Sequence, residues 1–248
     1  MNGGGKVALI TGAARRIGAA IARDLAALGW SVAVHHHRSL AAAQTLVGTI
    51  EDRGGRAQAF AANLESEAET SELVGRVADA LGPVHCLINN ASVFERDEAL
   101  SVTRDSWERH MQVNLRAPFL LTQAFARQAP EAGGCVINLL DQRVWNLTPH
   151  FTSYTVSKSA LWTLTQTLAM ALAPMVRVNA IGPGPTLKGA RQSGDHFARQ
   201  RRATILNRGA TPSDITAALG YLIAARGVTG QMIALDGGQH LTWSDGGV

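Results

Sequence analysis

The feature that most constrains the fold is an alternation of short apolar runs with longer amphipathic stretches along the whole chain. The apolar runs are rich in Val, Ile and Leu, and several are apolar on both faces, which is typical of a parallel sheet covered by helices. The alternation predicts one α/β domain spanning residues 1–248, with a doubly wound, seven-stranded parallel sheet and right-handed crossovers. We expect strands at residues 7–11, 31–35, 57–61, 84–89, 134–139, 176–181 and 232–236, and helices at 17–28, 40–53, 68–81, about 105–128, 153–172 and 213–225.

Residues that begin and end helices stand where this pattern requires them. Gly29, Gly54 and Gly82 fall at expected C-terminal caps. The stretch TPSD at 211–214 is typical of a helix start, with polar residues ahead of the first turn. We find no linker that divides the chain into two domains.

Composition excludes several classes of protein. Of the 248 residues 46% are hydrophobic, which is enough for a substantial core. The first residues lack the apolar stretch of a signal peptide, and no apolar window is long enough to cross a bilayer. We therefore expect a soluble cytoplasmic protein without a membrane partner. Cys86 and Cys135 lie in apolar runs, which favours reduced core thiols over a disulfide.

The charge pattern does not indicate a nucleic-acid-binding protein. The net charge is +4, but the basic residues are scattered. Only RQRR, at 199–202, is a dense basic run, and a solvated helix face or a mobile loop explains it better than a nucleic-acid site.

A glycine-rich turn follows the first expected strand. The sequence TGAARRIG places Gly12 in the turn and Ile17 and Gly18 at the start of the first helix. A helix N-terminus offers free backbone N–H groups to a pyrophosphate, and glycine allows the backbone to approach closely. This arrangement predicts a dinucleotide site. Arg16 stands where the usual pattern has its middle glycine, either as a surface residue or as a cation that reaches the phosphates and the cleft.

The end of the second expected strand indicates which dinucleotide binds. NAD-preferring sites place an acidic residue here for the ribose 2′-hydroxyl. The sequence instead has His37, Arg38 and Ser39, whose donors and positive charge suit the 2′-phosphate of NADP. Three consecutive histidines also raise the question of a metal, but successive residues on a strand point to opposite faces. We therefore predict no metal site.

Tyr154 and Lys158 are spaced by one helical turn, so both side chains face one cleft. A cation near a phenol favours the phenolate, and so moves the pKa of the tyrosine toward the pH at which it could act as an acid or base. Asp141 ends an apolar run thirteen residues before the tyrosine. The presence of a carboxylate beside such a pair is unusual.

Taken together, these motifs resemble the short-chain dehydrogenase/reductase family over essentially the whole chain. The resemblance implies a single-domain Rossmann fold, NADPH as cofactor and a homotetramer. By this resemblance Asn114, Tyr154 and Lys158 are catalytic, Tyr154 supplies a proton, and Lys158 lowers the tyrosine pKa and binds the nicotinamide ribose. The matching motifs are, in chain order, the glycine-rich turn with Gly12, Ile17 and Gly18; the pair Asn63 and Leu64; and the NNAS stretch with Asn90, Ala91 and Ser92. They continue with Asn114, with Tyr154 and Lys158, with GPG at 182–184, which ends in Gly184, and with DGG at 236–238.

Asp141 departs from the family, which normally has a serine at this position. Ketone reduction builds negative charge on oxygen, which an ionised carboxylate repels and a hydroxyl stabilises. A C=N substrate is different, because its nitrogen gains a proton as the carbon takes hydride, and a carboxyl group can relay that proton or accept bonds from ring N–H groups. These properties match a pterin.

The pattern is most similar to the pteridine reductase subgroup. That likeness implies that Arg16 contacts both cofactor and pterin, that Ser92 lines both, that Phe94 stacks on the pterin ring, and that Asp141 and Tyr154 handle the proton. Other interpretations remain open: Phe94 in the core, Ser92 as a turn residue, or Arg16 and Asp141 as a structural ion pair. Residues of about 184–205 correspond to the variable substrate loop.

These observations predict an NADPH-dependent reductase that transfers hydride to a C=N bond of a dihydropterin, of the dihydrobiopterin, dihydromonapterin or dihydrofolate type. One alternative is a general short-chain carbonyl or 3-oxoacyl reductase, against which Asp141 counts. A second is a non-catalytic NADP-binding sensor, against which Tyr154, Lys158 and Asn114 count.

Overall fold

Seven parallel strands form one sheet in the order β3-β2-β1-β4-β5-β6-β7 in the computed structural model, which describes residues 5–189 and 192–242. The order reverses between β1 and β4, so the sheet is doubly wound as predicted. The strands are β1 (Val7–Ile10), β2 (Ser31–His36), β3 (Arg56–Ala61), β4 (Val84–Asn89), β5 (Gly134–Leu139), β6 (Val176–Pro183) and β7 (Met232–Leu235).

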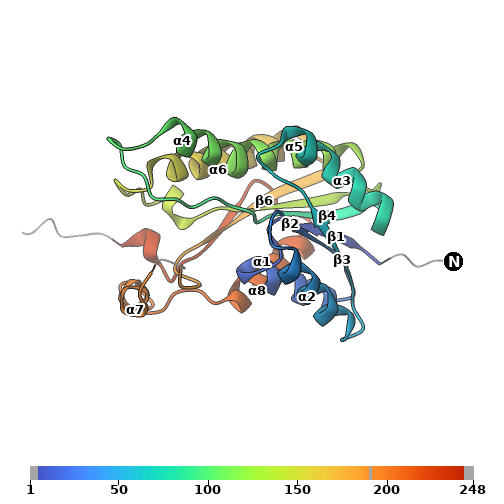
Figure 1. The fold of residues 1–248 in the computed structure, drawn as a ribbon, viewed down its shortest axis with the longest axis horizontal. Coiled ribbons are helices and arrows are strands. Elements are labelled where there is room, and N and C mark those ends of the chain that lie inside the picture. The colour runs from blue at the N-terminus through green and yellow to red at the C-terminus, as the bar shows by residue number, and fades with distance from the viewer. Residues whose placement is uncertain (1–4, 190–191, 243–248) are drawn as a thin grey trace, which may run out of the picture.

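Helices cover both faces of the sheet. Figure 1 shows α3, α4, α5 and α6 on one face and α1, α2 and α8 on the other, while α7 lies beyond the sheet at the end opposite the N-terminus. The helices are α1 (Arg16–Ala27), α2 (Leu40–Glu51), α3 (Glu67–Leu81), α4 (Arg104–Met111), α5 (Ala117–Arg127), α6 (Thr152–Ala171), α7 (Gly194–Arg202) and α8 (Pro212–Ala224).

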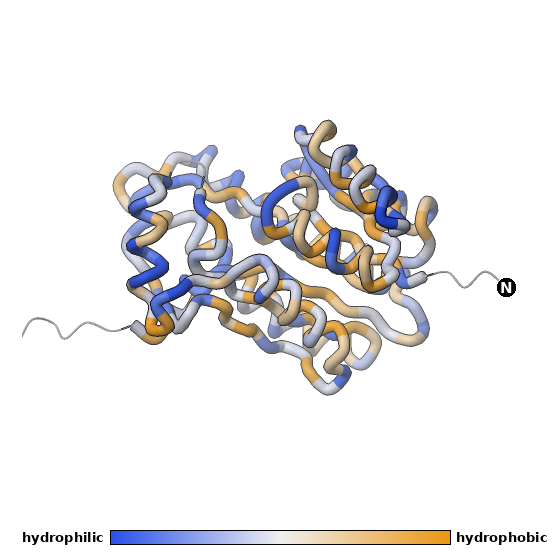
Figure 2. Tube along the Cα trace, turned by 90° about the horizontal axis from the view of Figure 1, so that it is seen from below, coloured by the Kyte–Doolittle hydropathy of each residue, from blue (hydrophilic) through white to orange (hydrophobic). Residues whose placement is uncertain are grey.

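Alternation along the strands builds one core layer on each side of the sheet. In β1, Ala8 and Ile10 pack in the layer that contains residues of α1, α2 and α8, whereas Val7 and Leu9 pack in the layer that contains residues of α3, α5 and α6. Each buried Leu or Ile contributes about 1.5–3 kcal/mol relative to exposure. Figure 2 shows hydrophobic (orange) and hydrophilic (blue) segments alternating along the trace.

The structure confirms the predicted strands and most of the predicted helices to within a few residues. Gly29, Gly54 and Gly82 adopt positive φ at helix ends. Thr211 and Asp214 form a capping box, with Thr211 accepting from the Asp214 N–H and the Asp214 carboxylate accepting from the Thr211 N–H. Cys86 and Cys135 are buried free thiols, as expected.

The expected single helix at 105–128 is wrong. It is divided into α4, a π-helical segment η1 (Gln112–Arg116) and α5. A π-helical turn widens the helix by one residue and is often found at functional sites.

The basic run at 199–202 lies in α7, a helix that apolar periodicity in the sequence does not predict. Its residues are exposed or half-buried, which confirms the solvated-helix interpretation. Positions 190 and 191 of the predicted substrate loop lie outside the described residues. Among residues 5–189 and 192–242, no helix is long and apolar enough to span a membrane.

Candidate active site

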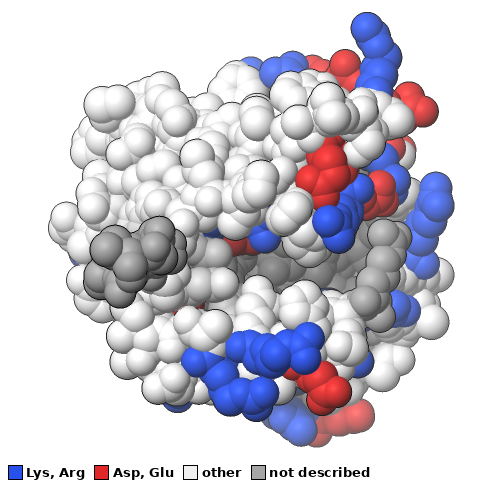
Figure 3. Space-filling view, turned by 90° about the vertical axis from the view of Figure 1, so that its left-hand side faces the viewer, with Lys and Arg blue, Asp and Glu red and all other residues white. Residues whose placement is uncertain are grey.

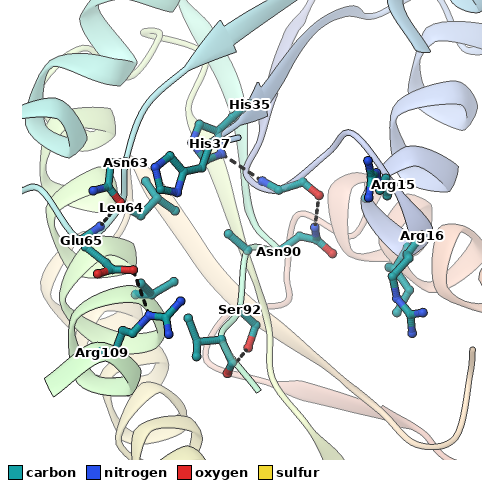
Figure 4. Close-up of a pocket in the computed structure, with 16 residues that line it drawn as sticks. Arg15, Arg16, His35, His37, Asn63, Leu64, Glu65, Asn90, Ser92 and Arg109 are labelled. Carbon is teal, nitrogen blue, oxygen red and sulfur yellow. Dashed lines mark hydrogen bonds and ion pairs between the residues drawn. The ribbon is translucent and has the colours of Figure 1, made fainter. Parts of the chain in front are cut away.

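A pocket of about 430 Å³ opens at the carboxyl ends of the strands, where doubly wound sheets bind ligands. In the view onto this end, a hollow separates the upper and lower halves of the molecule, with acidic and basic side chains around it (Figure 3). The pocket lining includes these residues from the predicted cofactor set: Gly12, Arg16, Ile17, Gly18, His37, Asn63, Leu64, Asn90, Ala91 and Ser92. Figure 4 shows how their side chains surround the pocket.

The glycine-rich turn is packed so tightly that side chains are excluded from it. Gly12 has φ +61°, and a Cβ there would lie 3.0 Å from the Ala91 Cα. A Cβ on Gly18 would lie 2.6 Å from both Asn90 Nδ2 and the Gly12 carbonyl. The Asn90 amide donates to the carbonyls of Thr11, at 2.8 Å, and Gly12, at 3.1 Å. The turn is thereby held against the end of β4.

Helix α1 begins at this turn with no side-chain cap and no acidic residue in its first turn. Its first backbone N–H groups are therefore left for an anion, and the positive end of the helix dipole favours one. These features fit a dinucleotide pyrophosphate.

His35 connects the turn to the neighbouring strands, a role that the sequence did not reveal. Its Nδ1 accepts the Gly12 N–H at 3.0 Å, and its Nε2 donates to the Ala62 carbonyl at 3.1 Å. Burial lowers the pKa of His35 to about 4, so the ring is neutral at pH 7. Both ring nitrogens are therefore already engaged in hydrogen bonds.

The three residues predicted for the 2′-phosphate follow β2. His37 lines the pocket. Arg38 is exposed, and Ser39 is half-buried at the N-cap of α2 without a side-chain capping bond. Neither Arg38 nor Ser39 lines the pocket.

Arg16 adopts φ +56°, a left-handed conformation that costs a residue with a side chain about 1–3 kcal/mol. Its guanidinium donates to the carbonyls of Lys188, at 2.8 Å, and Leu187, at 3.1 Å. Arg16 therefore joins the glycine-rich turn to the predicted substrate loop. The alternative of an Arg16–Asp141 ion pair is wrong for this conformation, because no such pair occurs among the described residues.

Asn114 lies in the π-helical segment and holds the segment that follows β4. Its Oδ1 accepts from the Val93 N–H at 2.8 Å and the Ser92 hydroxyl at 3.2 Å. Its Nδ2 donates to the Val93 carbonyl at 3.0 Å and to Ser157 of α6 at 3.1 Å. Asn114 thereby connects the pocket wall to the helix that carries Tyr154.

Tyr154, Lys158 and Asp141 meet where β5 ends against α6. The Tyr154 hydroxyl donates to Asp141 Oδ2 at 2.8 Å, and Asp141 Oδ1 accepts from the Arg143 N–H at 2.9 Å. The Lys158 ammonium donates to the Leu139 carbonyl at 2.7 Å and lies 5.9 Å from the Tyr154 ring centre. The structure thus brings together the carboxylate, phenol and cation that the sequence predicted.

The electrostatics differ from the expectation that Lys158 lowers the tyrosine pKa. Burial, and then the charge and hydrogen bond of Asp141, raise the pKa of Tyr154 far above its usual value. Burial lowers the pKa of Lys158 to about 8, with Asp141 partly opposing the shift. Tyr154 is therefore a neutral phenol at pH 7.

Phe94 lies beside this group and is 54% exposed, so the alternative of a core role is wrong. Its ring makes an edge contact with Tyr154, with centroids 4.6 Å apart, and stacks on Phe151 at 4.5 Å. The Arg143 guanidinium lies 5.0 Å from the centre of the Phe151 ring. Phe151, with φ +61°, was not singled out from the sequence.

Gly184 lies outside the lining of the dinucleotide pocket. Its N–H donates to the Leu235 carbonyl at 2.9 Å, and a Cβ there would lie 2.6 Å from the Asp236 Cβ. The packing of the loop after β6 against the end of β7 requires a glycine at this position.

A doubly wound sheet with a dinucleotide turn and a buried Tyr–Lys pair at its carboxyl edge defines a class, the nucleotide-dependent oxidoreductases. The chain belongs to the short-chain dehydrogenase/reductase family. Residues 12–240 match the family model described as enoyl-(acyl carrier protein) reductase.

Solved structures and curated proteins match nearly the whole chain. The structure of FolM alternative dihydrofolate reductase 1 from Brucella canis, complexed with NADP, has a TM-score of 0.95 and 44% identity, covering 99% of this chain and 98% of that one. An uncharacterised oxidoreductase of Methylorubrum extorquens is 34% identical, covering 94% of this chain and 97% of that protein. A 3-oxoacyl-[acyl-carrier-protein] reductase of Synechocystis is 30% identical over 94% and 96% of the two chains.

Proposed function

We propose that this chain is an NADPH-dependent reductase that transfers hydride to a C=N carbon of a dihydropterin, of the dihydrobiopterin, dihydromonapterin or dihydrofolate type. The observation that carries the proposal is the Asp141 carboxylate, which accepts the Tyr154 hydroxyl at 2.8 Å. A ketone reductase needs a hydrogen-bond donor at this position, because charge develops on the substrate oxygen.

The chain is an NADP-dependent oxidoreductase of its family, and NADPH supplies the hydride when bound. Three structural neighbours that are 33–45% identical to the chain were crystallised with NADP. The glycine-rich turn and the α1 N-terminus would hold the pyrophosphate of the cofactor, and Asn63 and Leu64, which line the same pocket, would contact its adenine. His37, which lines the pocket, would donate to the 2′-phosphate, whereas Arg38 and Ser39 would have to turn toward the pocket to join it.

Asp141 and Tyr154 have different roles in this proposal: Asp141 accepts hydrogen bonds from the substrate, and Tyr154 donates a proton to it. Each carboxylate oxygen of Asp141 accepts one bond within the protein and keeps a second lone pair for a ring N–H or amino group of a pterin. Tyr154 enters as a phenol, because burial and Asp141 raise its pKa. As the ring nitrogen gains negative charge it draws the tyrosine proton, and the Lys158 ammonium, 5.9 Å from the centre of the Tyr154 ring, is a cation beside the resulting phenolate.

The surrounding residues suit a flat heteroaromatic ring. Phe94 is half exposed beside Tyr154 and offers its ring for stacking. Ser92 lines the cofactor pocket, and its hydroxyl donates to Asn114 Oδ1 at 3.2 Å. We propose that Arg16 contacts both cofactor and pterin, and its bonds to the carbonyls of residues 187 and 188, which join the glycine-rich turn to the substrate loop, support this role.

One specific observation favours the carbonyl alternative: several curated relatives are named 3-oxoacyl reductases at 30% identity. The FolM structures are closer, at 44% and 45% identity, and their printed name is a dihydrofolate reductase. A binding-only sensor would not need the complete Tyr154, Lys158 and Asn114 arrangement. We further propose that the protein is a homotetramer, which size-exclusion chromatography with light scattering tests.

The test is to mix the purified protein with NADPH and a panel of 7,8-dihydropterins, dihydrofolate, ketones and a 3-oxoacyl thioester, and to follow NADPH absorbance. The proposal expects the highest kcat/KM with a dihydropterin or dihydrofolate, abolished in Tyr154→Phe. Turnover of a ketone or thioester with none of any pterin would overturn it, and cofactor binding without any turnover would favour the sensor.

A further inference from the structure

We propose that His110 is a positioning residue that fixes the position of the proton donor Tyr154 relative to the ring-stacking Phe94. The inference rests on the proposed function for the roles of those two side chains. His110 itself is fully buried in α4 and is not among the residues that line the dinucleotide pocket, and its ring packs edge-on to that of Tyr154 with 6.2 Å between centroids.

One side of the His110 ring holds the segment that carries Phe94. Its Nε2 accepts the backbone N–H of Glu95 at 3.2 Å. A ring nitrogen that accepts an N–H carries no proton, so the proton of the neutral imidazole lies on Nδ1. The hydrogen-bond partner thus defines the tautomer, and it ties His110 to the residue next to Phe94.

The other side of the ring holds the start of the helix that carries Tyr154. Nδ1 lies 2.8 Å from the Ser106 carbonyl and 2.8 Å from the Ser153 hydroxyl oxygen, so its proton is shared between these two acceptors. Since Ser153 Oγ accepts from His110, its own proton is directed to Oδ2 of Asp97. The chain of donors therefore runs in one direction, from His110 through Ser153 to Asp97.

Asp97 completes the connection by capping α6. Its Oδ1 accepts the Ser153 N–H at 3.1 Å, and its backbone carbonyl accepts the Phe151 N–H at 2.9 Å. Burial opposes ionisation of Asp97, but hydrogen bonds from Ser153 and Ser106 outweigh it and lower the pKa. An ionised carboxylate at a helix N-terminus is stabilising.

His110 is thus the only side chain among the described residues that bonds both to the residue after Phe94 and to the residue before Tyr154. A displacement of about 1 Å at a catalytic group costs up to a hundredfold in rate. An ordinary buried histidine would instead contribute to stability alone. Replacing each ring nitrogen of His110 separately distinguishes the two roles, because a positioning residue affects kcat and KM whereas a merely structural one affects only stability.

Two variants separate the two nitrogens. His110→Gln places an amide oxygen near the Nε2 position, so it keeps an acceptor for Glu95 but loses the donor to Ser153. His110→Asn keeps a donor near Nδ1 but loses the acceptor. We expect the Gln variant to lower kcat roughly tenfold or more with little change in pterin KM, and the Asn variant to raise pterin KM several-fold with a smaller effect on kcat.

Two controls accompany these variants. His85→Gln removes a comparable hydrogen bond, the one that His85 Nδ1 accepts from the Val7 N–H at 3.1 Å at the opposite end of the sheet, and should alter stability without altering either kinetic constant. Ser153→Ala leaves His110 intact and should reproduce the kcat loss of the Gln variant. If neither His110 variant folds, Ser153→Ala carries the test alone, and an unchanged kcat there would refute the inference.

Amide hydrogen exchange provides a readout that does not depend on turnover. His110→Asn should speed exchange in a peptide containing Glu95, and His110→Gln should speed it in a peptide containing Ser153. Equal kinetic losses in both variants, or lower stability with unchanged kinetics, would overturn the positioning role. If the wild-type protein reduces a ketone and no pterin, the proposed function fails, whereas the kcat effect measured with that ketone still decides whether His110 positions Tyr154.

Discussion

Tyr154 donates its phenolic proton to Asp141 Oδ2 across 2.8 Å, and the Lys158 ammonium lies 5.9 Å from the centre of the same ring. Burial, together with the charge and the hydrogen bond of the carboxylate, raises the pKa of Tyr154 well above its usual value. The pair suits a substrate that presents N–H groups to the carboxylate and takes a proton on nitrogen.

Replacing Asp141 should separate pterin from ketone reduction. Asp141→Asn keeps the size of the side chain but removes its charge, so we expect kcat with a dihydropterin to fall about 10²-fold or more. Asp141→Ser supplies a hydroxyl donor and should raise ketone turnover above that of the wild type. NADPH oxidation measures both. NADPH affinity, followed by fluorescence, should not change. Full pterin activity in Asp141→Asn would show that the carboxylate has no role in pterin reduction.

The pH dependence of catalysis should report Lys158. Its pKa is lowered to about 8, so the ammonium loses its proton as the pH rises through that value, and kcat/KM should fall above about pH 8. Lys158→Arg stays protonated throughout, because an arginine pKa exceeds 12, and should lack this decline at whatever activity it retains. A wild-type profile that is flat to pH 10 would contradict the assigned role of the cation.

Stability should fall on acidification because of His35. Its pKa is about 4 in the folded protein and 6.5 in the unfolded chain, so the unfolded state binds more protons between these values. Stability is complete above pH 6.5 and decreases by up to about 3 kcal/mol as the pH falls to 4. Urea unfolding of the wild type and of His35→Gln at several pH values measures the difference. His37→Gln, at an exposed position, is the control and should keep the wild-type slope.

The left-handed conformation of Arg16 yields a comparison of two variants. Arg16→Gly relieves the strain at φ +56°, whereas Arg16→Ala keeps it, and both lose the bonds to residues 187 and 188. We expect the Gly variant to be more stable than the Ala variant by about 1 kcal/mol in urea unfolding. Both should raise the substrate KM. Equal stability of the two would indicate that Arg16 leaves this conformation in solution.

Local sequence patterns predicted most of the fold, because apolar period and turn residues act over a few neighbours. The division of 105–128 was not predictable in this way, since the segment QVNLR contains no helix breaker. The π-helical turn accompanies the placement of Asn114 against Val93, twenty-one residues away. Helix α7 was missed because it has no buried residues, and therefore no apolar period to detect.

In the site, too, features set by neighbouring residues in the sequence were predictable, whereas features set by tertiary contacts were not. Motifs at strand ends indicated that Gly12 and Asn90 lie together, and both line the pocket, because the carboxyl ends of parallel strands meet at one edge of the sheet. The bonds of Arg16 to a loop 172 residues away and the stacking of Phe94 on Phe151 depend on tertiary packing. The raised pKa of Tyr154 was also unpredictable, because it depends on burial and on the distance to Asp141.

The central claim is that hydride goes to a ring carbon of a pterin, and isotope transfer tests it most directly. The wild-type protein would be given NADPH deuterated at nicotinamide C4 on the transferred face, together with a 7,8-dihydropterin and a 3-oxoacyl thioester in competition, and the products would be analysed by mass spectrometry. The account predicts one deuterium in the tetrahydropterin ring and little in the thioester product. Deuterium on the hydroxyl-bearing carbon of the thioester product, with none in the pterin, would contradict it.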